Sequence, residues 1–147
     1  MIIKRRRYMP LFYKQAIPNQ IKKLMEGISM QHISGITYNQ LAYLTITHHD
    51  FEDKTKQGHL IVNYKIADEV LKIFEELYKI RYPIEKMEII DYFAGKEKQI
   101  GDKLDYASIE ANNTSAFNDR LKVTDRGVQK EISLHAMRFG DRYKSKN

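Results

Sequence analysis

Cysteine is absent from this chain of 147 residues, which excludes disulfide frameworks and zinc sites built on thiolates. Long apolar runs are also missing. The opening stretch MIIKRRRYMPLFYKQ has a basic patch without the apolar run of a secretory signal behind it, and no segment approaches the length of a membrane span. We therefore expect no membrane span, and the sequence leaves the compartment open.

Two kinds of catalytic signature are missing as well. The chain has no glycine-rich phosphate loop, and no Ser, His and Asp or Cys and His arrangement stands out by its spacing. Nucleophilic catalysis therefore has no support from spacing alone.

The overall composition is that of an ordinary globular protein. Hydrophobic residues make up 42% of the chain and charged residues 30%, which excludes a collagenous or wholly disordered chain. At this length, one folding unit with one core is expected.

The net charge of +6 permits binding to nucleic acid, an anionic polymer or a membrane surface. The positive excess lies at residues 4–7 and 138–146, while the middle of the chain mixes both signs. Aromatic residues interleave with the first basic group, as in some nucleic-acid-binding segments. A solvated basic lead-in over residues 1–16 is the simpler interpretation, and we expect no nucleic-acid partner.

Hydrophobic spacing predicts the first half of the fold. Residues 17–30 follow a weak helical pattern after Pro18, and residues 40–47 alternate as a strand. A polar loop over residues 48–58 and a short apolar run at 59–62 then predict a β-hairpin with a long loop.

The next residues predict a long helix and a further strand. Asn63 can cap a helix whose apolar stripe includes Ile66, Val70, Ile73, Leu77 and Ile80, and Pro83 ends it. Residues 85–92 read as a strand, and residues 93–124 form a polar stretch that is typical of a functional or disordered segment. The order of elements predicts an α+β fold, with a small antiparallel sheet and flanking helices.

His48, His49 and Asp50 are the one cluster with metal-ligand chemistry. Adjacent residues on a strand point to opposite faces, which makes it difficult for His48 and His49 to bind one ion. We therefore interpret them as histidines at the edge of the hairpin loop.

The C-terminal third carries two motifs, NNTSAFNDR at residues 112–120 and SLHA at residues 133–136. Together with the sequence that precedes them, they resemble the zinc D-Ala-D-Ala carboxypeptidases and L-alanyl-D-glutamate endopeptidases of the VanY type, which cleave bacterial cell-wall peptides. The resemblance covers about residues 17–136. It implies an incomplete version of the D-Ala-D-Ala metallopeptidase fold.

The resemblance also assigns roles to three residues. His135 matches the first zinc ligand, Ser133 matches the serine two positions before it, and Arg120 matches the arginine that helps to hold the substrate carbonyl as it becomes an oxyanion. Zinc with three protein ligands keeps a fourth position for water, while a cation stabilises the developing negative charge. The implied partner is a peptidoglycan stem peptide, and such enzymes usually work in the cell envelope or outside the cytoplasm.

The sequence departs from the family pattern after SLHA. The family has a zinc-binding aspartate seven positions after the histidine, where this chain has Arg142, while Asp141 lies one position early. The later segment with the general base and the last zinc histidine is missing. We therefore expect a C-terminally truncated relative that binds no zinc and is inactive as a peptidase.

A shift of reading frame accounts for this departure. Permitted codons for RFGDRYKSK, read one base later, translate as GLAIDINPK, which restores the family pattern and places an aspartate at position 142. We therefore divide the chain into a basic lead-in at 1–16, an incomplete peptidase-like domain at 17–137, and an out-of-frame tail at 138–147.

Other interpretations of the same residues stay open. The chain can be a binding module for cell-wall peptide or protein that has lost catalysis, or a basic nucleic-acid-binding domain. NNTSAF can also be a turn-rich loop with Phe117 packed inside, and His135 a surface residue.

Overall fold

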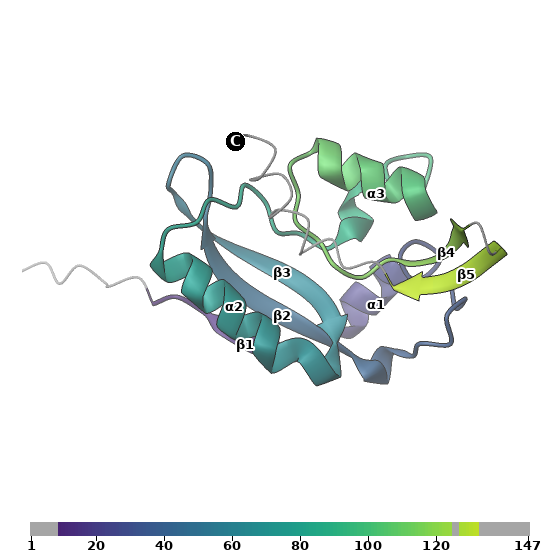
Figure 1. Ribbon diagram of the computed structural model, residues 1–147, viewed down its shortest axis with the longest axis horizontal. Coiled ribbons are helices and arrows are strands. Elements are labelled where there is room, and N and C mark those ends of the chain that lie inside the picture. Colours follow the sequence, from purple (N-terminus) through teal and green to yellow (C-terminus); the bar gives the residue numbers. More distant parts are fainter. Residues whose placement is uncertain (1–8, 125–126, 133–147) are drawn as a thin grey trace, which may run out of the picture.

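The computed structural model describes residues 9–124 and 127–132 (Figure 1). The strands are β1 (Phe12–Gln15), β2 (Leu41–His49), β3 (Thr55–Asn63), β4 (Asp119–Thr124) and β5 (Gly127–Ile132). The α-helices are α1 (Asn19–Met25), α2 (Ala67–Lys79) and α3 (Gly101–Glu110), and short 3₁₀ turns η1, η2 and η3 cover Tyr38–Gln40, Tyr64–Ile66 and Ile90–Phe93. The fold is α+β, as the sequence predicts.

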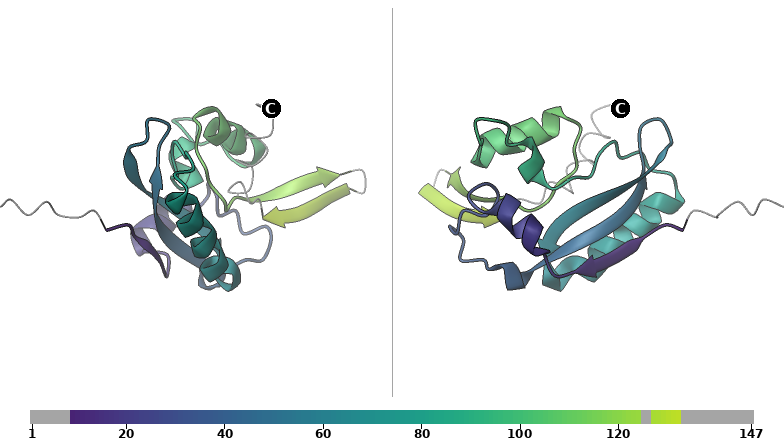
Figure 2. Two further views of the ribbon diagram at one scale, coloured as in Figure 1. Left: turned by 60° about the vertical axis from the view of Figure 1, so that its left-hand side comes forward. Right: turned by 180° about the vertical axis from the view of Figure 1, so that it is seen from behind.

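The central sheet is antiparallel, with the strand order β1-β2-β3. Every residue of β2 is buried, because both faces of the sheet are covered. The predicted inward residues Ala42, Leu44 and Ile46 do lie on one face, where they pack with Phe74 of α2. Tyr43, on the opposite face, packs with residues of α1, so the sheet separates two groups of buried side chains (Figures 1 and 2).

The helix predicted after Asn63 is confirmed as α2. The Asn63 side chain accepts a hydrogen bond from the Lys65 amide at 2.9 Å, which caps the turn that leads into α2. The helix ends at Lys79, and Arg81 takes a positive φ of 56° two residues before Pro83. The predicted apolar stripe was too wide, because Ile73 and Ile80 are 45% and 69% exposed.

The helix predicted over residues 17–30 is shorter in the structure. It ends at Met25, and Gly27 turns the chain back with a φ of 78°. Glycine adopts this left-handed conformation without the strain that a Cβ atom causes. Residues 26–30 instead form a tight turn, in which Glu26 and Met30 make an isolated bridge.

The predicted hairpin is confirmed, but its loop is shorter than the sequence indicated. Strand pairing continues to His49 and Thr55, which leaves residues 50–54 as the turn. The Asp50 carboxylate accepts hydrogen bonds from the amides of Glu52 and Lys54, at 2.9 and 2.8 Å, and so closes this turn. The two histidines therefore belong to the strand and not to the loop.

The strand predicted over residues 85–92 was wrong. This segment makes isolated contacts, such as the His59 amide to the Met87 carbonyl at 2.6 Å, and then enters η3. It crosses β3 at Gly58, where a Cβ atom would lie 2.5 Å from Met87 Cβ. The buried Met87 side chain packs into the core at this crossing, and the chain does not continue along the strand.

The polar stretch at residues 93–124, predicted to be functional or disordered, carries two regular elements, α3 and β4. Strands β4 and β5 pair with each other in a separate two-stranded sheet, which extends away from the central sheet (Figure 2). Helix α3 lies beside η3 and above the segment that leads into β4 (Figure 1).

The described ends of the chain bear on three further predictions. β1 lies inside the predicted lead-in at 1–16, whereas the basic residues 4–7 and the tail at 138–147 lie outside the described residues. Within the part of the chain that the structure describes, no helix is long and apolar enough to cross a membrane.

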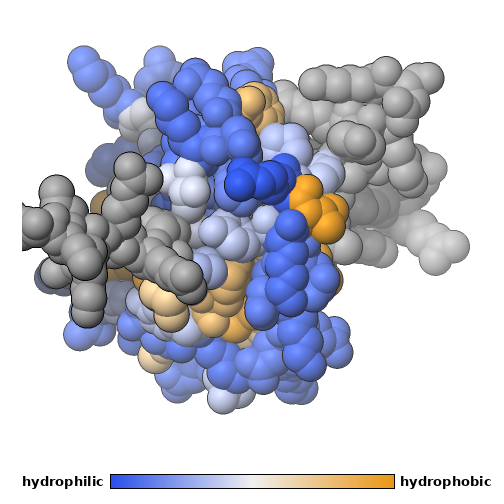
Figure 3. Space-filling model, turned by 90° about the vertical axis from the view of Figure 1, so that its left-hand side faces the viewer, coloured by the Kyte–Doolittle hydropathy of each residue, from blue (hydrophilic) through white to orange (hydrophobic). Residues whose placement is uncertain are grey.

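One end of the molecule presents a largely hydrophilic surface with a few small hydrophobic areas (Figure 3).

Candidate functional site around Arg120

The motif NNTSAFNDR follows α3, and its last two residues begin β4. Residues 113–119 are all buried, although five of the seven are polar. Phe117 is 3% exposed and packs in the core, as the structural interpretation of this motif expects. Because buried polar groups require hydrogen-bond partners, the partners of this segment define what holds it in place.

Asn113 attaches the start of the segment to the chain before η3. Its Oδ1 accepts a hydrogen bond from the Glu88 amide at 2.8 Å, and its Nδ2 donates to the Glu88 carbonyl at 2.9 Å. Nδ2 also lies 3.0 Å from the hydroxyl of Ser108 on α3. The side chain thus pairs with both backbone groups of Glu88, as a residue of a neighbouring antiparallel strand would.

Asp119 attaches the end of the segment to the turn after α1. Its amide donates to the Ser29 carbonyl at 2.8 Å, and its carboxylate accepts from the amides of Ile33 and Ser34 at 3.0 and 3.2 Å. The side chain is fully buried. These bonds fix the position at which β4 begins, and with it the position of Arg120.

Arg120 lies between two carboxylates of α3. Its Nε is 2.9 Å from Asp105 Oδ2, and its Nη1 donates to Asp102 Oδ1. Asp102 and Asp105 are three residues apart on the helix, so they lie on the same face. Asn118 supports this arrangement by donating from Nδ2 to Asp105 Oδ1 at 2.7 Å and to the Gly101 carbonyl at 3.2 Å.

This geometry gives the guanidinium a fixed orientation. Arginine stays charged at any physiological pH and presents planar donors that match a carboxylate or another oxyanion. The side chain is only 14% exposed, and the contact with Asp105 is ionic because the direction of Nε is poor for a hydrogen bond. The arrangement can therefore hold one cationic group steady for an oxygen ligand.

Ser133 and His135 lie outside the described residues, so their predicted roles stay predictions. Within residues 9–124 and 127–132, no group of three His, Asp or Glu side chains is placed to hold a metal ion. The described residues alone therefore do not form a zinc site.

His48, His49 and Asp50 do not converge on a common point. His48 Nδ1 lies 2.7 Å from the Ile84 carbonyl, and burial lowers the pKa of this ring. His49 stacks on Tyr78 of α2, with ring centroids 4.6 Å apart. The Asp50 carboxylate accepts the hydrogen bonds that close the hairpin turn. The two histidines are thus buried structural residues, each with its own partner.

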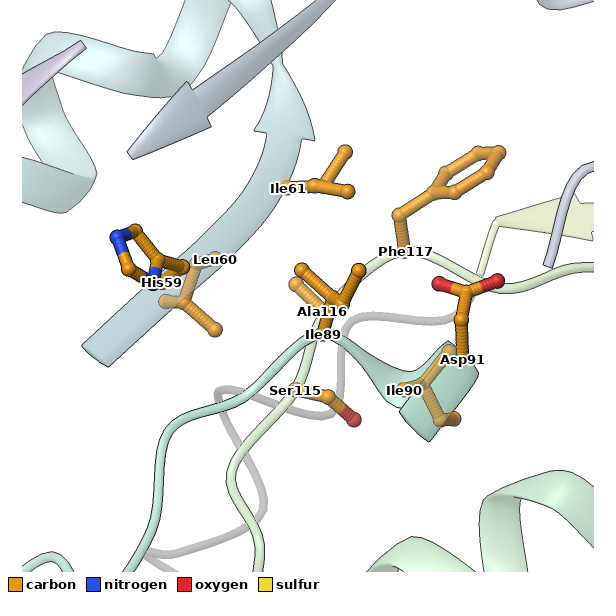
Figure 4. Close-up of a pocket in the computed structure, with 9 residues that line it drawn as sticks. All are labelled: His59, Leu60, Ile61, Ile89, Ile90, Asp91, Ser115, Ala116 and Phe117. Carbon is orange, nitrogen blue, oxygen red and sulfur yellow. The ribbon is translucent and has the colours of Figure 1, made fainter. Parts of the chain in front are cut away.

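The lining of a small pocket between β3, η3 and the motif segment includes a serine, a histidine and an aspartate, whose polar groups point in different directions (Figure 4). His59 stacks on Tyr43 with ring centroids 4.7 Å apart, and the Ser115 hydroxyl lies 3.2 Å from that of Ser108. Asp91 accepts from the Ser29 amide at 3.0 Å. Since each of the three polar groups faces a different partner, the pocket does not hold a catalytic triad.

The partners of Arg120 were missed by sequence reasoning. A signal for Asn118 was present, because it lies two residues before Arg120 and therefore on the same side of an extended chain. Asp102 and Asp105 had a weaker signal, a pair of acids three residues apart in a stretch that was not predicted to be helical.

Comparison with protein-family models, with curated proteins and with solved structures finds no match to this chain. The resemblance to VanY-type peptidases therefore stays a prediction from the sequence of about residues 17–136.

Proposed function

We propose that this chain is the N-terminal part of a zinc-dependent cell-wall peptidase of the D-alanyl-D-alanine carboxypeptidase type, and that it is inactive as these 147 residues. In the intact enzyme Arg120 would hold the substrate oxygen that gains negative charge. Ser133 and His135 would belong to the metal half of the site.

The observation that supports this proposal is the fixed orientation of the Arg120 side chain. A surface arginine without a role samples many rotamers, whereas this guanidinium is held by the buried Asp105, which Asn118 in turn holds by a hydrogen bond. Stabilisation of an oxyanion requires a donor that is oriented before the reaction. A fixed arginine at the end of the NNTSAFNDR motif is consistent with that task.

The first experiment is to sequence the gene again from the codon of Met137 onward. We expect a one-base shift to open a frame that reads GLAIDINP and later a Trp-His segment. Absence of such a frame would overturn the proposal that this chain is the front part of a peptidase.

The second experiment uses the product of that longer frame. We expect it to bind zinc and to release D-alanine from N-acetyl-L-lysyl-D-alanyl-D-alanine, whereas the present chain releases none. Arg120→Lys should keep the zinc and reduce kcat by about 100-fold, because a donor to the oxyanion is displaced. His135→Ala should lose both zinc and activity. A product that binds zinc but does not hydrolyse this peptide would contradict the assignment.

A binding module without catalysis is the second candidate. One observation favours it. The residues that orient Arg120, Asp105 and Asn118, all belong to the present chain, and their contacts need no metal. Binding of muropeptides by the present chain, unaffected by salt, would support it. Binding to DNA or RNA that falls steeply with salt would instead indicate a nucleic-acid-binding domain.

A further inference from the structure

Asp91 lies where two parts of the structure that position Arg120 meet. Its neighbour Ile90 packs with Leu104 of α3, the helix whose carboxylates contact the guanidinium. On another side, Asp91 Oδ1 accepts a hydrogen bond from the amide of Ser29 at 3.0 Å. Asp91 is thus in contact with the turn after α1 and lies beside α3.

The turn at residues 29–34 connects Asp91 to the start of β4. Ser29 uses both of its backbone groups, because its amide donates to Asp91 and its carbonyl accepts from the Asp119 amide at 2.8 Å. The Asp119 carboxylate also accepts from two further amides of this turn. Since Ser29 is fully buried between these partners, a shift of Ser29 moves the backbone immediately before Arg120.

The Asp91 carboxylate is incompletely paired. Its Oδ2 is buried and has no hydrogen-bond partner within residues 9–124 and 127–132. The pocket beside it is lined largely by apolar side chains, including Ile89 and Phe117 (Figure 4). Burial therefore raises the pKa of the Asp91 carboxyl, and its contacts with Ser29 offset only part of this effect.

Other titratable side chains face the same region. Burial, the bond to Glu26 and the charge of Asp91 together raise the pKa of the Tyr38 hydroxyl, so Tyr38 stays uncharged in acid. Glu26 accepts from that hydroxyl at 2.6 Å and lies 2.5 Å from His32 Nε2 on the exposed side of the turn, and these bonds lower its pKa. His59 of β3 lines the same pocket as Asp91, and burial lowers the pKa of its ring. The shift of Asp91 is therefore opposite in sign to that of Glu26, the other carboxylate that binds this turn near α1.

We propose that Asp91 is a pH-sensitive switch, in which loss of its charge weakens the bond to Ser29 and lets the turn, Asp119 and Arg120 shift together. A hydrogen bond to an ionised acceptor is roughly twice as strong as one to a neutral acceptor, which sets the direction of the effect. Ionisation strengthens this one bond although burying the charge opposes folding as a whole. The proposal concerns the described residues and does not depend on the peptidase assignment.

The test is a pH titration of the isotopically labelled chain by NMR, from about pH 7 to about pH 3. The ¹³C resonance of the Asp91 carboxyl gives the midpoint of its own titration. The amides of Ser29, Ile33 and Ser34 and the Nε–Hε of Arg120 report on the connected groups. We expect all of them to show a transition at the Asp91 midpoint, and the Ser29 amide proton to move upfield in acid as its bond weakens.

Asp91→Asn should abolish this shared transition, because the asparagine oxygen still accepts from the Ser29 amide but carries no charge at any pH. Transitions of Arg120 that come from its own partners, Asp102 and Asp105, should persist in this variant. Glu26→Gln is the matched control. It removes a carboxylate from the exposed side of the same turn and should leave the shared transition in place.

Three results would overturn the proposal. The first is a midpoint for the Ile33 and Ser34 amides or for Arg120 that differs from that of the Asp91 carboxyl, and the unchanged chain alone shows this even where a variant does not fold. The second is a shared transition that persists in Asp91→Asn, and the third is its loss in Glu26→Gln. If the shared transition is found and the longer reading frame is absent, the switch stands and the peptidase assignment fails.

Discussion

The sheet with α2 and the segment that leads to Arg120 are buried to a similar degree, yet different forces hold them. Leu44, Ile46 and Phe74 pack as apolar side chains, whose stabilisation grows with buried area and has no preferred direction. Asn113 and Asp119 instead make directed hydrogen bonds to the backbone of distant segments. The first region tolerates exchanges of similar volume, whereas the second depends on donor and acceptor positions.

Leu44→Ala should have the largest effect and should test the apolar region. The side chain is fully buried in the centre of β2, so its removal leaves a cavity and should lower the free energy of unfolding by about 3 kcal/mol. Urea denaturation followed by circular dichroism measures this change. Ile80→Ala, at a side chain that is 69% exposed, is the control and should shift stability by less than about 0.5 kcal/mol. Equal losses in both variants would remove the distinction between core and surface.

Asn113→Ala should test the polar region. It leaves the amide and carbonyl of Glu88, which are partly buried, without the partner side chain and should lower the free energy of unfolding by about 1–2 kcal/mol. Asn112→Gly is the neighbouring control, because Asn112 has a φ of 58°, which glycine adopts without strain. We expect this control to stay within about 0.5 kcal/mol of the unchanged chain, again by urea denaturation. An unchanged free energy of unfolding in Asn113→Ala would mean that water replaces these hydrogen bonds.

The two regions also differ in how well the sequence predicts them. Alternation in β2 and the helical spacing of α2 are local patterns, and both elements were predicted with nearly the right bounds. The backbone amides that donate to the side chains of Asn113 and Asp119 are 25 and 85 or 86 residues away, so no local pattern indicates them. The motif predicted that Arg120 matters, but the carboxylates that orient it required the structure.

Gly58→Ala should test the junction between the two regions. A Cβ atom there would lie 2.5 Å from Met87 Cβ and 2.6 Å from the Met87 carbonyl oxygen, so the crossing segment must move. We expect a loss of about 1–2 kcal/mol in the free energy of unfolding, as for other overpacked sites. Ala94→Gly, at another buried small residue, is the control and measures the stability change that a substitution at such a site ordinarily causes. Gly95→Ala is unsuitable as a control because Gly95 has a positive φ of 72°. Unchanged stability in Gly58→Ala would show that the crossing adapts.

Asp91→Asn should have the smallest effect and the opposite sign. Burial raises the pKa of this carboxyl, so ionising it at neutral pH opposes folding. A raised pKa gives stability that is present below the pKa of the unfolded chain and is lost as the pH rises through the higher folded value. The variant should therefore melt at a higher temperature at pH 7, and this gain should shrink as the unchanged chain becomes protonated in acid.

Thermal melting at a series of pH values measures this difference. Glu97→Gln serves as the control and should show no such gain at pH 7. A Tm for Asp91→Asn that is below that of the unchanged chain at pH 7 would mean that the ionised carboxylate is needed for its bond to the Ser29 amide.

The bonds of Asp119 also set an order of events during synthesis of the chain. Residues 41–79 contain the whole β2–β3 hairpin and α2, so this part can assemble soon after it leaves the ribosome. The turn at residues 29–34 has to wait much longer, because its amides receive their carboxylate from residue 119. A ribosome stalled before that residue is exposed would thus carry a formed hairpin and helix beside an unanchored N-terminal turn.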